Sequence, residues 1–297
     1  MALSSFTLPS FAKINLQLRV IGKREDGFHE LFTVFQTVSL SDSISFAEAG
    51  GVDVTCDDRL MPVDETNLIV KAAKALQLRF RIEQGSAIHL EKRIPSPGGL
   101  GGGSSNAAVA LIGLRRLWDI EMADDELGQI AAELGSDVPF FLHGGTAIGR
   151  GRGEMIEPIS DLGEQFILIV TPNVSVSTKR AFEGMNASTL TNEDSNRILR
   201  DCRKEVDSLD LGHSALINDF EESVFDAFPE IQRVKETLLE LGAVNAAMSG
   251  SGASVFAIFD KTETRQAALK ALDHESTWRK FAVTTISRSE FREALRV

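Results

Sequence analysis

The stretch Pro97-Gly98-Gly99-Leu100-Gly101-Gly102-Gly103-Ser104-Ser105-Asn106 decides how the rest of this chain is interpreted. Glycine occupies all but one of the positions 98–103, so the backbone N–H groups there are open to a large anion. Residues 87–92 alternate like a strand, and apolar residues recur at helical spacing from Ala107 to Trp118. The order strand, glycine loop, helix predicts a phosphate site, because unpaired N–H groups and the positive end of the helix dipole face the loop.

The loop matches neither of two common nucleotide-binding motifs. No Lys-Ser/Thr pair follows the last glycine, so it is not a Walker A loop, and Ser104 stands where a dinucleotide fingerprint has its third glycine. A flexible linker is the alternative, but a linker is not expected between a strand and a strong helix.

Composition narrows the class of partner. The 297 residues suffice for two packed domains, and the net charge of −12 argues against nucleic acid or an anionic membrane surface. Cys56 and Cys202 form no CxxC pattern, and the histidines have no zinc spacing. We see neither a signal peptide nor an apolar run of membrane-helix length, so we expect a cytoplasmic protein that acts on a small molecule.

Strand-like and helix-like segments alternate irregularly, without the regular rhythm of a doubly wound sheet, which predicts an α+β fold of two domains. A polar segment at 160–165 marks the expected boundary. We assign 1–160 to an N-terminal ATP-binding domain that carries the glycine-serine loop, and 161–297 to a C-terminal α+β domain that completes the substrate site. Strands are expected at 13–20, 30–39, 43–46, 52–56, 166–170, 244–248, 255–259 and 281–286.

Two segments carry polar residues that are candidates for catalysis or binding. Residues 13–20 alternate cleanly, with Lys13 and Asn15 on the polar face, a pattern typical of a half-exposed strand with a solvated polar side. Asp137 follows a helix that Gly135 ends and precedes an apolar patch, so it is a candidate buried or semi-buried carboxylate. The glycine-rich stretch 144–154 is most simply a hairpin.

The stretch 97–106 resembles the phosphate loop of the galactokinase, homoserine kinase, mevalonate kinase and phosphomevalonate kinase (GHMP) superfamily. Lys13-Ile14-Asn15-Leu16 and Met248–Ser254 fall in that family's order and extend the resemblance over nearly the whole chain. Three segments, at 11–16, 24–29 and 137–141, are similar to the kinases that act on 4-diphosphocytidyl-2-C-methyl-D-erythritol. Phe28 stands where these kinases usually have Tyr, and Asn106 where they often have Asp.

The resemblance implies a two-domain fold with the active site at the domain junction. It also implies transfer of the ATP γ-phosphoryl group, with Mg²⁺, to a hydroxyl of that cytidine diphosphate-linked polyol, a step of non-mevalonate isoprenoid precursor synthesis. Lys13 would stabilise the transferring charge, Asp137 would be the base, and Ser104 or Ser105 would contact a phosphate or the metal. No tightly bound cofactor is implied.

By the same match, Asn67 and residues 97–106 would bind ATP. Asn15, Phe28, His29 and Phe182 would bind the cytidine substrate, the two phenylalanines by stacking and His29 at the base edge. Thr178 and Asp219 lie in a family-like context without an assigned role. A sister kinase for homoserine or mevalonate, and an inactive nucleotide-binding regulator, remain alternatives, and the protein would be a monomer or a homodimer.

Overall fold

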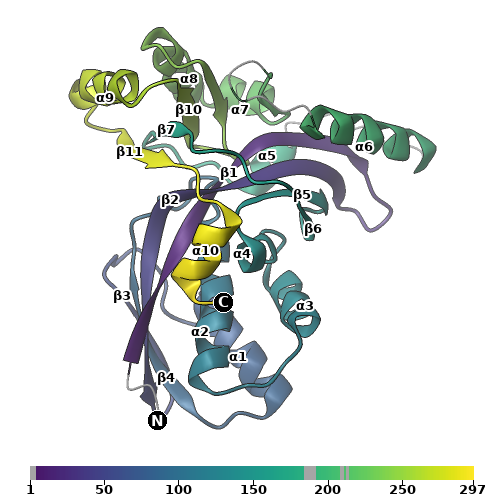
Figure 1. Cartoon of the computed structure of the whole chain (residues 1–297), viewed down its shortest axis with the longest axis vertical. Helices are drawn as coiled ribbons and strands as arrows, with labels where there is room; N and C mark the ends of the chain where they lie inside the picture. Colours follow the sequence, from purple (N-terminus) through teal and green to yellow (C-terminus); the bar gives the residue numbers. More distant parts are fainter. Residues whose placement is uncertain (1–4, 184–191, 208–210, 212–213) are drawn as a thin grey trace.

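A long antiparallel hairpin, β1 (Ser5–Lys23) and β2 (His29–Ala49), forms the centre of the molecule (Figure 1). The computed structural model describes residues 5–183, 192–207, 211 and 214–297. The hairpin belongs to a seven-stranded sheet in which β2 pairs with both β4 and β5 at different points along its length. The remaining strands of this sheet are β3 (Val52–Cys56), β4 (Gly85–Glu91), β5 (Thr146–Gly151), β6 (Met155–Pro158) and β8 (Ile217–Asn218).

A layer of helices packs on this sheet and contributes to one apolar core with it. The layer consists of α1 (Leu68–Phe80), α2 (Gly102–Leu117), α3 (Asp124–Leu134), α4 (Phe140–His143) and α10 (Arg288–Leu295). The helix α2 lies closest to the strands: a Cβ at Gly113 would lie 2.4 Å from the Phe46 ring. Close contact of α2 with the sheet fixes the position of the glycine loop at its N-terminus.

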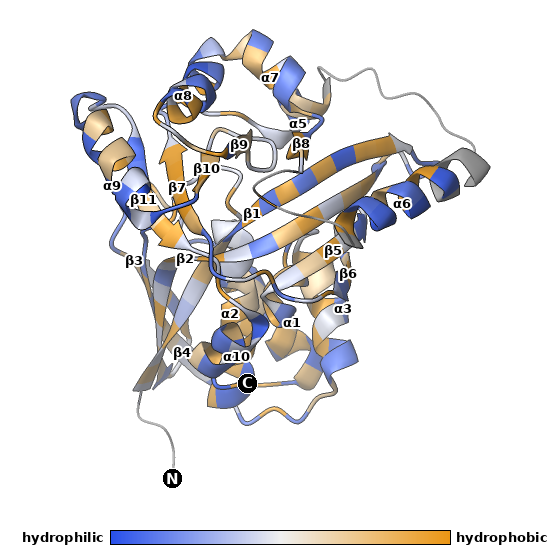
Figure 2. Cartoon of the chain, turned by 45° about the horizontal axis from the view of Figure 1, so that its top comes forward, coloured by the Kyte–Doolittle hydropathy of each residue, from blue (hydrophilic) through white to orange (hydrophobic). Residues whose placement is uncertain are grey.

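The second sheet is four-stranded and antiparallel, in the order β11-β7-β10-β9. Its strands are β7 (Phe166–Thr171), β9 (Asn245–Met248), β10 (Val255–Phe259) and β11 (Arg279–Thr284). The helices of this half are α5 (Thr178–Glu183), α7 (Glu221–Ala227), α8 (Pro229–Glu240) and α9 (Thr262–Ala271). Hydrophobic colouring marks β7 and β10, whereas α6 (Asn192–Asp207), which packs on the far end of the hairpin, is mostly hydrophilic (Figure 2).

The α+β class is confirmed, and most expected elements are present within a few residues. The segments 30–39 and 43–46 are one strand, not two, because β2 continues through both. The helices α6 and α10 were not predicted. The expected solvated face of β1 is wrong: Lys13 is 3% and Asn15 is 2% exposed. Its polar face is buried because the glycine loop covers it, with the Lys13 N–H donating to the Leu100 carbonyl (3.0 Å).

The proposed division at residue 160 stays a prediction. The two sheets do separate near it, since β6 ends at Pro158 and β7 begins at Phe166. However, two later elements return to the first sheet: β8 pairs in parallel with β1, and the Phe291 ring of α10 lies 5.7 Å from the Phe11 ring of β1.

Candidate active site

The first and third glycine stretches pack directly against each other. The Gly99 carbonyl accepts hydrogen bonds from Ser249 Oγ and Lys13 Nζ, each at 3.0 Å, and the Ser254 N–H donates to the Gly98 carbonyl (3.2 Å). Gly99 has φ +71°, and a Cβ there would lie 2.0 Å from the Ser249 carbonyl oxygen. Only glycine fits this contact, which joins residues from the two halves of the chain.

The glycine loop ends at the N-terminus of α2. Gly101 caps the helix at φ +69°, where a Cβ would lie 2.8 Å from the Phe141 ring. The first N–H groups of a helix have no intrahelical acceptor, so they are available to an anion at this end. Ser104 lines the cavity there, whereas Ser105 and Asn106 are buried and accept hydrogen bonds from Ser10 Oγ (2.8 and 2.7 Å).

A cavity of about 840 Å³ opens between the loop, β1, β2 and the second half of the chain. Residues 95–104 form one wall, Ser136 and Asp137 another, and residues 250–252 a third. Among the sequence-predicted site residues, the cavity brings together Lys13, Asn15, Phe28, His29, Phe182 and Asp137 with 97–104. The volume is in the range usual for small-molecule sites.

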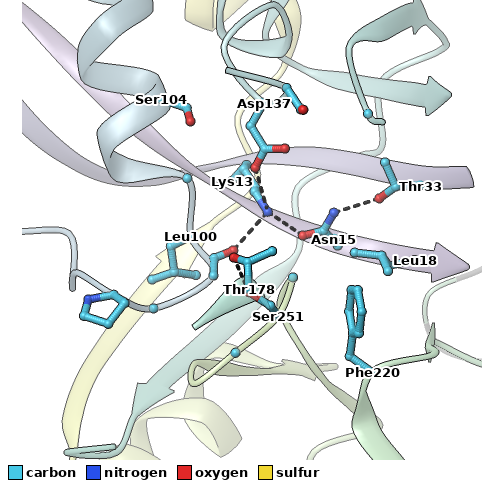
Figure 3. Close-up of a pocket in the computed structure, with 18 of the residues that line it drawn as sticks. Lys13, Asn15, Leu18, Thr33, Leu100, Ser104, Asp137, Thr178, Phe220 and Ser251 are labelled. Atoms are coloured by element: carbon cyan, nitrogen blue, oxygen red, sulfur yellow. Dashed lines mark hydrogen bonds and ion pairs between the residues drawn. The ribbon is translucent and has the colours of Figure 1, made fainter. Parts of the chain in front are cut away.

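Lys13 is the centre of the polar network in this cavity (Figure 3). Its Nζ lies 3.4 Å from Asp137 Oδ2 and donates to Asn15 Oδ1 as well as to the Gly99 carbonyl. Asn15 Nδ2 in turn donates to Thr33 Oγ1 (2.7 Å), which donates to the Gln17 carbonyl (2.7 Å). The chain of bonds fixes which end of the Asn15 amide faces the ammonium group.

Two features of β1 set this geometry. The register with β2 shifts between Asn15, opposite Phe35, and Gln17, opposite Val34, so Leu16 is an extra residue in a bulge. Bulges of this kind re-aim side chains and are frequent beside active sites. Burial lowers the pKa of Lys13, while the nearby carboxylate of Asp137 opposes that shift.

The aromatic residues lie at the other end of the cavity. The rings of His29 and Phe182 stack at 4.7 Å, and Phe182 meets Phe220 edge-on at 4.8 Å. Phe28 is 53% exposed, and the Arg152 guanidinium lies 5.0 Å from its ring centre. Burial lowers the pKa of His29, with a further contribution from Lys23, so the imidazole is neutral at neutral pH and can both donate and accept.

One predicted ATP contact lies elsewhere. Asn67 caps α1: its Oδ1 accepts from the Ile69 N–H (2.8 Å), and its Nδ2 donates to the Pro62 carbonyl (2.6 Å). It does not line the cavity, although Leu68 beside it does.

Several lining residues were missed by the sequence reasoning. Thr33 had no distinguishing signal within its strand, and Phe220 precedes the first residue of α7. Arg152 belongs to the stretch 144–154, which does form the β5–β6 hairpin but also points a guanidinium toward the aromatic end. Thr178 lines the cavity, and its hydroxyl lies 3.1 Å from Ser251 Oγ. Asp219 does not line the cavity; its carboxylate accepts a hydrogen bond from the Val20 N–H (2.8 Å).

Two family patterns match this chain: "GHMP kinases N terminal domain" over residues 67–145 and "GHMP kinases C terminal" over residues 201–276. A protein of Syntrophotalea carbinolica named 4-diphosphocytidyl-2-C-methyl-D-erythritol kinase is 38% identical over 96% of this chain and 100% of its own length. A crystal structure of 4-(cytidine 5'-diphospho)-2C-methyl-D-erythritol kinase is 32% identical, with a TM-score of 0.76, over 94% of this chain and 99% of that one.

A homoserine kinase from Cytophaga hutchinsonii is similar in fold, with a TM-score of 0.71 over 97% of this chain and 96% of its own, at 22% identity.

Within the described part of this chain, no helix is long and apolar enough to cross a membrane. The same residues contain no group of three or more His, Cys, Asp or Glu side chains arranged to hold a metal ion.

Proposed function

This chain belongs to the GHMP kinases and, within them, to the 4-diphosphocytidyl-2-C-methyl-D-erythritol kinases, and from that premise we propose a role for each part of its cavity. The protein is a small-molecule kinase that transfers a phosphoryl group from ATP to a hydroxyl of the cytidine diphosphate-linked polyol. One observation carries the assignment of roles: the ion pair of Lys13 and Asp137 lies in the same cavity as both the glycine loop and the aromatic cluster.

The glycine loop is the ATP phosphate site. Its support is the N-terminus of α2, where open backbone N–H groups and the helix dipole favour negative charge. Ser104 is the hydroxyl on this loop that faces the cavity, while Ser105 and Asn106 hold the loop to β1 through Ser10. Asn67 acts on ATP indirectly, by fixing the start of α1 beside Leu68.

Lys13 and Asp137 act on the transferring group. The Lys13 ammonium lies against the Gly99 carbonyl of the loop, close enough to the phosphate site to offset the charge that develops on the phosphoryl oxygens. Asp137 is the candidate base: its side chain is one-third exposed, so its carboxylate is open to the acceptor hydroxyl, which it orients and whose proton it accepts.

The aromatic end binds the cytidine. The exposed ring of Phe28 offers a face for stacking, and the neutral imidazole of His29 offers a donor and an acceptor for the base edge. Phe182 closes the same end beside His29. Arg152, over the Phe28 ring, adds a positive charge where the substrate's diphosphate enters.

Mg²⁺ accompanies ATP in this proposal. It is typically held by the substrate's phosphates with few protein ligands, and the Ser104 hydroxyl and the Asp137 carboxylate are oxygen ligands that the cavity offers near the loop. When bound, Mg²⁺ neutralises phosphate charge.

We also place the protein in the cytoplasm, where its free thiols, Cys56 and Cys202, would stay reduced.

A coupled ADP-release assay tests the function. ADP should form when ATP, Mg²⁺ and 4-diphosphocytidyl-2-C-methyl-D-erythritol are all present, and not with homoserine or mevalonate in its place. The sister kinases are the less favoured alternative, because the homoserine kinase shares the fold at only 22% identity. Equal ADP release with either of these acceptors would move the assignment to a sister kinase.

A further inference from the structure

A second cavity, of about 990 Å³, is lined by residues of α10 and of the helices α2, α3 and α4. Figure 1 shows these helices close together on one side of the first sheet. We call it the α10 cavity. It shares no lining residue with the cavity that holds Lys13 and Asp137. The proposed kinase reaction does not use it, and its size is again that of a small-molecule site.

Arginine side chains gather around the α10 cavity from two directions. Arg115 and Arg116 come from the last turn of α2, and three more come from α10 and the residue that follows it, namely Arg288, Arg292 and Arg296. Five guanidinium groups around one cavity repel one another unless anions offset them.

The carboxylates in the same lining offset only part of this charge. Asp124 forms an ion pair with Arg115 (3.1 Å). The Glu154 carboxylate accepts a hydrogen bond from the backbone N–H of Arg152, a residue that does not line the α10 cavity (2.6 Å). Asp119 and Asp125 are the other acidic lining residues, and both are exposed.

Several guanidinium donors are therefore left over. Arg292 and Arg296 are exposed at the rim of the cavity, and within the described residues their side chains have no hydrogen bond or ion pair. Arg116 is half-buried and lies over the Phe6 ring (5.0 Å). Arg288 is the partnered member of the cluster: it donates to the Thr146 and Ile159 carbonyls (2.6 and 3.2 Å) and lies 3.9 Å from the Asp161 carboxylate, and only its buried Nε has no partner among the described atoms. Guanidinium groups of this kind bind phosphate and carboxylate by paired hydrogen bonds.

Part of the cavity is apolar, although Gln129 and His143 also line it. Ile112, Ile120 and Leu127 are buried and line it, and Leu142, Ile156 and Leu295 line it from the other elements. A ligand that fits both parts has an anionic head for the arginines and a short hydrocarbon tail for this lining.

We propose that the α10 cavity is a second binding site, for a small anionic amphiphile with a phosphate or carboxylate head and an alkyl or alkenyl chain. Its walls adjoin the kinase cavity. Pro139, two residues from Asp137, lines the α10 cavity, and so does Glu154, the residue after Gly153 of the kinase cavity. A ligand here therefore lies one loop away from the base and from Arg152.

The test uses hexyl phosphate as the probe, titrated into the full chain by calorimetry with Mg-ATP present to fill the glycine loop. We expect one saturable site. Affinity should rise about fourfold for each methylene that becomes buried along the series ethyl, butyl, hexyl phosphate. Added salt should weaken binding of the head.

Two double variants separate the site from general charge effects. Arg292→Gln/Arg296→Gln should weaken hexyl phosphate binding by about tenfold or more, because each charged hydrogen bond lost is worth at least that factor. The matched control is Arg59→Gln/Arg81→Gln, which removes the same charge at exposed residues outside both cavities. Arg81, like Arg296, is a left-handed C-cap, with φ 55° against 57°.

The control variant should bind hexyl phosphate as the unaltered protein does. Equal weakening in both double variants would overturn the proposal, because it would make the attraction a property of the whole surface. So would the absence of saturable binding, or hexyl phosphate binding no more tightly than ethyl phosphate. The chain-length series needs no variant, so it stands even if a double variant fails to fold.

Discussion

Replacing Thr33 with valine would test whether the Asn15 amide must be held in one orientation for catalysis. Thr33 and Asn15 are 1% and 2% exposed, and among the described residues the Thr33 hydroxyl is the only acceptor for Asn15 Nδ2. Valine keeps the side chain's shape but removes that oxygen. The amide donor is left buried without a partner, which costs about 1–3 kcal/mol.

Without that acceptor, the orientation of the Asn15 amide that places Oδ1 against Lys13 is no longer stabilised. If the amide rotates by half a turn, it presents its NH₂ group to the Lys13 ammonium in place of Oδ1. If the energy of the lost bond appears in the transition state, kcat falls by about 5- to 150-fold. The KM for ATP should change little, because the hydrogen bonds of the Thr33 hydroxyl among the described residues go to Asn15 and Gln17 and none to the glycine loop. Thr33→Ser, which keeps the hydroxyl, should restore most of kcat.

Thr146→Val is the matched control. Thr146 is as buried as Thr33, donates to Gln36 Oε1 (2.6 Å) and accepts from the Leu162 N–H (3.2 Å), but it lies outside the kinase cavity. Both valine variants should lower the melting temperature by similar amounts, and only Thr33→Val should lose kcat in the ADP-release assay. An equal loss of kcat in the two variants, or none in Thr33→Val, would refute the positioning role.

Three further outcomes follow from the same cavity. Asp137→Asn should lower kcat by about 10²–10⁴-fold, while calorimetry still detects ATP binding; near-normal turnover would remove the base from the mechanism. Because burial lowers the pKa of Lys13, activity that needs its ammonium form should fall with rising pH earlier than for an exposed lysine. In Asp137→Asn, which lacks the carboxylate that raises this pKa, the alkaline limb of the residual rate should move to lower pH; an unmoved limb would assign it to another group. Phe28→Ala should raise the KM for the cytidine substrate by about 5- to 150-fold with the KM for ATP unchanged, whereas Phe28→Tyr should shift it only slightly; joint losses with a lower melting temperature would make Phe28 a structural residue.

The sequence was sufficient for the features that depend on near neighbours. The glycine loop and the helix after it follow from residues within one or two turns of each other. The alternation in β1 correctly placed Lys13 and Asn15 on one face.

What covers that face could not be predicted from a local pattern. The period of a strand says which residues share a side, and here the cover comes from Gly99 and Leu100, far along the chain. The same limit applies to Thr33 and Arg152, whose roles arise from strand pairing and from a hairpin that folds back over the Phe28 ring. Ser105 and Asn106 resembled phosphate contacts by sequence neighbourhood, but the helix turns their side chains inward to Ser10.

The return of α10 and β8 to the first sheet has a consequence for biosynthesis. A nascent chain emerging from the ribosome has made every strand of that sheet except β8 by residue 158. It still lacks Phe291 and Leu295, which belong to the same core as α2, and the edge of β1 that β8 pairs with is open. Final packing of the N-terminal half therefore waits until residues 288–295 have left the exit tunnel. The edge of β1 stays unpaired until residues 217–218 have emerged, and the apolar surface that α10 covers stays exposed until residues 288–295 follow. Both are features that chaperones protect.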